Sequence, residues 1–220
     1  MAGLGEAGLT AQTTGVLCLA CAAALIVAER RGSRAGTWLF KPFAALFFLL
    51  TAAAGSPGDS VPGVFIMAGL TASAAGDLLL IPRSRPALFR AGIAAFALAH
   101  LLYIAGFTAA AAFPDPWVAA ALAAGATILG LRSWSWLAPW LPSRDRPLVA
   151  GYIVIISLML LTSGLAATGS APPVVFVASV MFVVSDLGVA RDRFVTDAGW
   201  HPFVISPFYF GAQVLFALSV

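Results

Sequence analysis

Two aspartates interrupt long apolar segments of the chain and are its strongest candidates for chemistry. Asp77 lies in the apolar run 61–81, and Asp186 lies in the apolar run 172–190. An ionisable side chain inside a membrane span costs roughly 3 kcal/mol or more, so such residues are mostly paired, hydrated or functional. Each aspartate lies a few residues before an arginine that follows its run. Similar depth on two helices predicts a shared polar site inside an apolar bundle.

Five other polar side chains lie in segments that are otherwise apolar. They are Lys41, His100, Tyr103, Tyr209 and Gln213. Lys41 is the only lysine, and two interpretations of it stay open: its ammonium group extends to the nearby membrane surface, or it pairs with an aspartate or a phosphate. A lone buried histidine is more often a hydrogen-bonded structural group than a ligand. Tyr209 and Gln213 are four residues apart and so share one face of a helix. The set as a whole favours a functional site more than any member does.

Metal-binding patterns are weak in this chain. A catalytic zinc usually has three protein ligands, and His100 with the two aspartates could supply them, but no pair has the close spacing of a zinc site. Cys18 and Cys21 form a C-x-x-C pattern inside an apolar segment, with no second cysteine pair. They are better interpreted as small apolar side chains. We therefore expect no metal and no other cofactor.

The composition determines the class of protein that must position these residues. Of the 220 residues, 61% are apolar and only 10% are charged, and the mean hydropathy is +0.98. A soluble domain carries about 25% charged residues, so this chain could not cover a surface that faces water. We expect an all-α integral membrane protein whose residues 1–220 form a single polytopic membrane domain.

Apolar segments of about 20 residues, the length that spans a membrane, predict eight transmembrane helices. Glycine and proline clusters separate them. The fifth segment is the weakest because it is short and mostly alanine, and the tryptophans that follow it at 134, 136 and 140 are expected to anchor a segment lying flat on the membrane surface. The eight predicted spans are 11–29, 37–54, 61–81, 89–112, 115–131, 147–168, 172–190 and 202–219.

The basic residues are distributed on one side of these spans. All twelve lie in the loops after spans one, three, five and seven or near the adjoining helix ends, where Lys41 and Arg90 are found. By the positive-inside rule this side is cytoplasmic and both termini face out. We expect a multi-pass protein of the cell membrane, of bacterial inner-membrane type, with its polar site towards the cytoplasm. No cluster of basic and aromatic residues indicates a nucleic-acid partner, and small residues in every span leave the oligomeric state undefined.

A weak internal repeat relates the two halves of the chain. Gly76-Asp77-Leu78 and Ser185-Asp186-Leu187 are 109 residues apart, and each closes a predicted span before a short loop that contains arginine. Two four-helix halves in the same orientation would form a parallel repeat. At the same offset His100 aligns with Tyr209, and little else is alike, so the repeat is a possibility that the residues alone leave open.

The polar residues also form a pattern that resembles the YhhN/TMEM86 family of lysoplasmalogenase-like membrane proteins. The similarity extends from the second predicted span to the last. Its most specific part joins Gly76-Asp77 to an H-x-x-Y pattern on the next span. The matching positions are Lys41-Pro42, Gly76-Asp77, Phe89, Gly92, Phe96, His100, Tyr103, Tyr152, Phe182, Ser185-Asp186, Tyr209 and Gln213.

This resemblance implies a membrane hydrolase of eight helices. Characterised members cleave the vinyl-ether bond of lysoplasmalogens to a fatty aldehyde and glycerophosphoethanolamine or glycerophosphocholine. The resemblance places the catalytic residues at Asp77, Asp186, His100 and Tyr103. The expected partner is a lyso-lipid from the membrane, and the substrate-binding candidates are Lys41, Tyr209, Gln213, Arg83 and Arg90.

General acid–base catalysis by the two aspartates is a mechanism that fits these residues. One carboxyl group would protonate the alkene carbon, and the other, ionised, would stabilise the resulting oxocarbenium ion and orient water, as in glycoside hydrolysis. Which aspartate takes which role stays open at this point. His100 and Tyr103 would position the water or hold charge. Lys41, with Arg83 or Arg90, would bind the phosphate of a lipid that enters sideways from the inner leaflet.

Other classes of function also use intramembrane carboxylates. A small proton-coupled transporter is the main alternative, because eight helices in two halves with carboxylates inside the bundle suit that task. An intramembrane aspartyl protease fits less well, since Ala74 stands where its G-x-G-D motif requires glycine. In a purely structural role, the aspartates would only pair with basic residues. Release of an aldehyde product in detergent would distinguish a hydrolase from these.

Overall fold

The computed structural model describes residues 2–82, 85–112, 114–196 and 201–220, and within them every regular element is a helix. Eight α-helices follow one another, with two short 3₁₀ helices between them. The α-helices are α1 (Ala2–Arg30), α2 (Arg34–Ala54), α3 (Val61–Leu80), α4 (Pro86–Ala110), α5 (Pro116–Leu137), α6 (Arg146–Ala167), α7 (Val174–Phe194) and α8 (His201–Ala217), and the 3₁₀ helices are η1 (Pro57–Asp59) and η2 (Ala138–Trp140).

Local sequence signals set where several of these helices begin. The Ser60 hydroxyl accepts a hydrogen bond from the Gly63 amide at 3.0 Å at the start of α3. The Asp115 carboxylate accepts one from the Trp117 amide at 2.8 Å at the start of α5. Proline occupies the first turn of these helices and of α4, where its missing N–H removes no helical hydrogen bond. The helices thus begin close to the predicted breakers.

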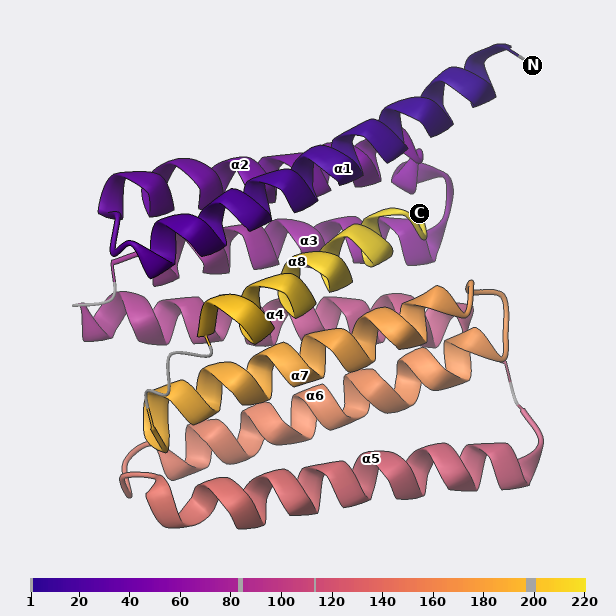
Figure 1. The fold of residues 1–220 in the computed structure, drawn as a ribbon. Coiled ribbons are helices and arrows are strands. Elements are labelled where there is room, and N and C mark those ends of the chain that lie inside the picture. The colour runs from indigo at the N-terminus through magenta and orange to yellow at the C-terminus, as the bar shows by residue number, and fades with distance from the viewer. Residues whose placement is uncertain (1, 83–84, 113, 197–200) are drawn as a thin grey trace.

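The helices run back and forth between two ends of a bundle (Figure 1). α8 is the central helix, because it contacts α1, α2, α3 and α7. α3 packs extensively on α4, and α4 also packs on α6. α5 lies at the periphery against α6, with little of its surface buried. The interior that positions the polar residues is therefore enclosed by every α-helix except α5.

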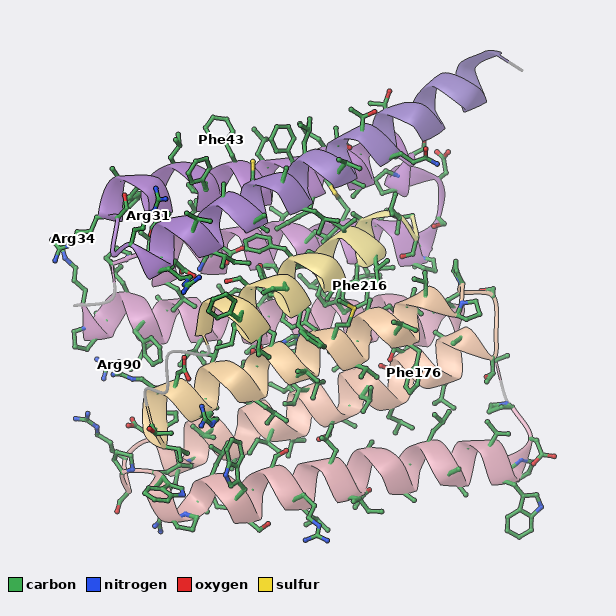
Figure 2. The ribbon with its side chains drawn as sticks, viewed as in Figure 1. Arg31, Arg34, Phe43, Arg90, Phe176 and Phe216 are labelled. Carbon is green, nitrogen blue, oxygen red and sulfur yellow. The ribbon has the colours of Figure 1, made fainter. Side chains whose placement is uncertain are left out.

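Seven helices, α1 to α7, are long and apolar enough to cross a membrane in the part of the chain described. α8 has 17 residues and so a length of about 25 Å, against a hydrocarbon core of about 30 Å. Large apolar side chains cover the outer surface, among them Trp117 on α5 and Phe43 on α2, which points away from the bundle (Figure 2). The chain is thus a multi-pass membrane protein, while its eighth span stays a prediction.

Basic side chains gather at one end of the bundle. Arg31, Arg34 and Arg90 all lie at the end where α1 meets α2 and α3 meets α4 (Figure 2). Both chain termini lie at the opposite end (Figure 1). The structure therefore separates the basic end from the termini, as the charge pattern predicts. The side of the membrane that each end faces stays a prediction.

The fifth helix is longer than the sequence predicts. The predicted span 115–131 is part of a helix that continues to Leu137, so Trp134 and Trp136 lie in α5, and the expectation of a flat segment there is wrong for these two residues. Leu137 is buried and forms a small apolar cluster with Ile153 of α6, against which Trp134 also packs. This packing favours continuation of the helix until η2.

Two glycines allow α3 and α4 to approach closely. A β-carbon at Gly69 would clash with the ring of Tyr103, and one at Gly76 would lie 2.8 Å from the ring of Phe96. Both rings belong to α4 and fill space that a side chain on α3 would occupy. The absence of side chains at these two positions therefore fixes where the aromatic residues of α4 enter the interior.

Candidate active site

The first polar cluster joins three helices and is here called the Lys41 cluster. It consists of Lys41 on α2, Asp77 on α3 and Tyr209 on α8. The Lys41 Nζ lies 3.1 Å from Asp77 Oδ1, and the Tyr209 hydroxyl donates a hydrogen bond to Asp77 Oδ2 at 2.6 Å. Both carboxylate oxygens thus have a partner.

Burial makes this ion pair structurally important. The Asp77 side chain is 2% exposed and that of Lys41 is 17% exposed. Removal of one partner from a buried ion pair leaves a charge without compensation and typically costs about 3–5 kcal/mol. Of the two interpretations of Lys41, the structure therefore supports the counter-ion. Asp77 is suited to carry a negative charge in place, since both of its neighbours donate to it.

The second polar cluster joins three other helices and is here called the His100 cluster. It consists of His100 on α4, Tyr152 and Met159 on α6, and Asp186 on α7. The His100 Nε2 lies 3.0 Å from both Asp186 Oδ2 and the Tyr152 hydroxyl, and its Nδ1 lies 3.2 Å from the Met159 sulfur. His100 is completely buried, whereas 13% of the Asp186 side chain is exposed.

This geometry suits proton transfer. A carboxyl group and a phenol both lie within hydrogen-bond distance of one imidazole nitrogen, His100 Nε2. An imidazole nitrogen can donate or accept a hydrogen bond, depending on the tautomer of the ring. In the Lys41 cluster, by contrast, the basic group is an ammonium that only donates hydrogen bonds. The two carboxylates therefore occupy chemically different surroundings.

An aromatic ring separates the two clusters. The Phe182 ring on α7 lies with its centroid 4.6 Å from that of His100 and 5.4 Å from that of Tyr209. It also contacts Phe96, Tyr103 and Phe216 within 6.4 Å. Phe182 thus forms the centre of an apolar core that touches both clusters.

A third group of polar side chains lies beside the aromatic core. The Tyr103 hydroxyl donates to Gln213 Oε1 at 2.9 Å and lies 3.4 Å from the Ser73 hydroxyl. All three side chains are buried. Gln213 follows Tyr209 by one turn of α8, so this group adjoins the Lys41 cluster.

The structure brings some of the predicted site residues together and keeps others apart. Lys41, Asp77 and Tyr209 form one cluster, and His100 with Asp186 belongs to the other. Tyr103 contacts Gln213 instead of either aspartate. The two carboxylates therefore have separate partners, which refines the expectation of one shared site.

The two predicted arginines differ in what the structure says of them. Arg90 lies in the second turn of α4, at the basic end of the bundle, with its side chain exposed (Figure 2). Arg83 lies outside the described residues. Among the residues that are described, no group of three or more His, Cys, Asp or Glu side chains is placed to hold one metal ion. The expectation that no metal takes part stays a prediction.

Sequence reasoning gave no role to two members of the His100 cluster. Tyr152 is one of only three tyrosines in the chain, and all three lie in the polar interior. The scarcity of tyrosine is therefore a signal that could have assigned Tyr152 to the site. Met159 has no such signal, because a methionine in an apolar helix is indistinguishable from an ordinary core residue.

The partners of the two aspartates are related by position in the chain. Asp77 on α3 is bonded by Tyr209 on α8, and Asp186 on α7 is bonded by His100 on α4. Tyr209 follows His100 by 109 residues, the same interval that separates the two aspartates. Each half of the chain thus supplies a partner for the carboxylate of the other half.

The fold and the clusters together define a multi-pass helical membrane protein with acidic and basic side chains paired in its interior. Within this class the chain belongs to the YhhN family, whose sequence profile matches residues 36–220. That range contains every member of both clusters. No solved structure gives a significant match to the chain.

Several relatives carry the name lysoplasmalogenase. The chain is 31% identical over 199 residues to lysoplasmalogenase TMEM86A of Bos taurus, which covers 83% of this chain and 72% of the relative. It is 33% identical over 183 residues to lysoplasmalogenase TMEM86B of Rattus norvegicus, covering 81% and 70% of the two chains. For lysoplasmalogenase TMEM86B of Homo sapiens the identity is 36% over 155 residues, covering 70% and 62%.

Proposed function

We propose that the protein is a membrane lipid hydrolase that cleaves the vinyl-ether bond of a lysoplasmalogen. The products are a fatty aldehyde and glycerophosphoethanolamine or glycerophosphocholine. The observation that carries this proposal is the similarity to relatives named lysoplasmalogenase over most of the chain. The residues of the two clusters lie within the range matched by the family, and their role in the reaction is part of this proposal.

The proposed reaction begins with a proton transfer to carbon. The Asp186 carboxyl group, in contact with His100, donates a proton to the alkene carbon that is not bonded to oxygen. The carbon attached to oxygen then becomes an oxocarbenium ion. The Asp77 carboxylate, held by Lys41 and Tyr209, stabilises this positive charge. The different partners of the two carboxylates are the reason for this assignment of roles.

Water completes the reaction. A water molecule adds to the oxocarbenium carbon and returns one proton to the Asp186–His100 pair, which gives a hemiacetal. The hemiacetal hydroxyl then loses its proton while the bond to the glycerol oxygen breaks and that oxygen takes up a proton. One water is consumed, and an aldehyde and an alcohol are released. Tyr152, next to His100, helps to orient the transferring groups.

The lipid is proposed to lie with its phosphate at the basic end of the bundle. Lys41 is engaged with Asp77 at 3.1 Å, so the exposed Arg90 is the better candidate for the phosphate among the described residues. The hydrocarbon chain would extend between the helices. The vinyl-ether bond then lies between the clusters, which requires the Phe182 ring to rotate away from Tyr209 and His100.

The decisive experiment is aldehyde release from lysoplasmenylcholine by the purified protein in detergent. We expect the parent protein to release aldehyde and Asp77→Asn and Asp186→Asn each to lose about 100-fold or more in kcat, the range of a general acid or base. Asp115→Asn is the matched control, because asparagine also caps a helix and Asp115 lies at the start of α5.

Two results would contradict this proposal. Absence of aldehyde from every vinyl-ether lipid would exclude the hydrolase and leave the transporter as the candidate. Full activity in both aspartate variants would exclude the carboxylates from the chemistry. Thermal unfolding of each variant in the same detergent shows that a loss of activity is not a loss of fold.

A further inference from the structure

Gln213 places its side-chain amide in the buried interior, one turn of α8 after Tyr209. Its side chain is completely buried, and its Nε2 has no hydrogen-bond partner among the residues that the structure describes. A buried donor of this kind is unfavourable unless something else binds to it. Such a group inside a candidate site points to a ligand.

The other half of the Gln213 amide is fixed. The Tyr103 hydroxyl donates its proton to Gln213 Oε1 at 2.9 Å, which orients the amide plane. The Phe182 ring contacts Tyr209, one turn before Gln213, and Phe216, one turn after it. Gln213 therefore lies on the face of α8 that is turned towards the aromatic core.

A hydrogen-bond acceptor is available on the same helix face. Tyr209 gives its only hydroxyl proton to Asp77, so the lone pairs of its oxygen can accept a hydrogen bond. A donor at Gln213 and an acceptor at Tyr209, four residues apart, form the complement of a neutral hydroxyl group. An alkyl chain satisfies neither, and an anion would meet the Asp77 carboxylate.

We propose that Gln213 and Tyr209 bind the free glycerol hydroxyl of the lyso-lipid. This inference rests on the proposed function, and it explains how the protein would recognise a lipid with one chain. The Gln213 amide donates to the hydroxyl oxygen, and the hydroxyl donates to the Tyr209 oxygen. A second fatty chain esterified at this oxygen would remove the donated proton and require additional space in a buried region, so the pair selects lyso-lipids over lipids with two chains.

The test compares two ether lipids that the enzyme cannot hydrolyse. One is a 1-O-alkyl lysophosphocholine with a saturated ether, and the other is the same lipid without the hydroxyl at the second glycerol carbon. Binding is measured by calorimetric titration of the full-length protein in detergent. We expect the parent to bind the hydroxyl lipid about five- to tenfold more tightly, the effect of one or two hydrogen bonds.

Substitution of Gln213 should abolish this preference. We expect Gln213→Leu and Gln213→Met to bind the two lipids within about twofold of each other. Both variants can keep the Tyr103 hydroxyl partnered, because the Ser73 hydroxyl lies 3.4 Å from it. Ser179→Ala is the control: Ser179 is buried, bonds only to the Val175 carbonyl of its own helix among the described residues, and should keep the preference.

The outcomes separate this inference from the proposed function. A hydroxyl preference that survives in both Gln213 variants overturns the inference, as does an equal loss of affinity for both lipids, which would indicate a bound water or a structural role. Aldehyde release by the parent protein is measured separately. If the preference is lost in the variants while no aldehyde forms, the hydroxyl site stands and the proposed reaction fails.

Discussion

Each interior carboxylate is matched by a basic side chain from another helix. Asp77 lies 3.1 Å from the Lys41 ammonium and Asp186 lies 3.0 Å from the His100 ring. An uncompensated charge in this apolar bundle would be costly, so we expect the loss of one member of either pair to destabilise the fold. Effects on stability and on activity can be tested separately. Replacement of both members of a pair by apolar side chains leaves no unpaired charge and removes the acid–base groups.

The Lys41–Asp77 pair leads to a prediction about stability. We expect Lys41→Met to lower the free energy of unfolding by about 3–5 kcal/mol, because it leaves a buried carboxylate without its cation. The double variant Lys41→Met with Asp77→Leu should recover most of this loss, yet release no aldehyde. Thermal unfolding in detergent measures the first effect. A double variant that is less stable than Lys41→Met would contradict the explanation.

Tyr152 gives a second prediction. Its hydroxyl lies 3.0 Å from His100 Nε2, and a hydrogen bond to a charged group is typically worth about 1.5–3 kcal/mol. We expect Tyr152→Phe to lower kcat for aldehyde release about tenfold or more, with little change in KM. Ser163→Ala on the same helix is the control, since the Ser163 hydroxyl bonds to the Leu160 carbonyl of its own helix. An unchanged kcat in Tyr152→Phe would argue against its proposed role.

Residue types and depth predict the members of the site better than their pairing. The sequence singles out Lys41, both aspartates and His100, because polar groups are rare in apolar segments. It does not show that Tyr209 bonds Asp77 instead of Asp186, since that choice depends on the order of helices around the bundle. Spacing along the chain carries no information on this order.

At the scale of helices, the close contact between α3 and α4 positions the aromatic residues of the site. A β-carbon at Gly69 would meet the Tyr103 ring, whose hydroxyl holds Gln213. The glycine is thus linked through one side chain to the proposed hydroxyl site. The sequence gives no sign of this, because glycines occur in every predicted span and only the packed structure distinguishes them.

Gly69→Ala tests this contact. We expect it to lower the free energy of unfolding by about 1–3 kcal/mol, the usual effect of overpacking in a core, and to reduce lipid binding because Tyr103 must move. Gly125→Ala on α5 is the matched control, since a β-carbon there meets no atom within 4 Å. It should be neutral or slightly stabilising. Thermal unfolding of both variants measures the difference. Equal stabilities of Gly69→Ala and Gly125→Ala would contradict the importance of the contact between Gly69 and Tyr103.

At the scale of the whole molecule, the helices and their ends follow from composition and charge. The apolar runs predict most helices with small errors at their ends. The exceptions are α1, which begins at Ala2, nine residues before the predicted span, and α5, whose extension to Leu137 depends on packing against α6. The basic residues predict one basic end, and the labelled arginines lie there (Figure 2). Position 77 pairs with 209 and position 186 pairs with 100, while the parallel repeat stays a prediction.

Membrane orientation gives the prediction at this scale. Because the arginines concentrate at one end, we expect that end to face the cytoplasm. Alkaline phosphatase fused after Val220 should then be active in a bacterial host, and the same enzyme fused after Arg144 should be inactive. The reverse pattern would show that the polar site opens to the other side of the membrane.

The positions of the paired residues in the chain also set the order in which the interior charges can meet their partners as the chain is synthesised. Lys41 is made before Asp77, and His100 precedes Asp186 by 86 residues. Each of these two acids is therefore made after its base, so its partner is already part of the chain when the carboxylate reaches the membrane. Tyr209, made 132 residues after Asp77, arrives with the last helix, and its arrival closes the interior.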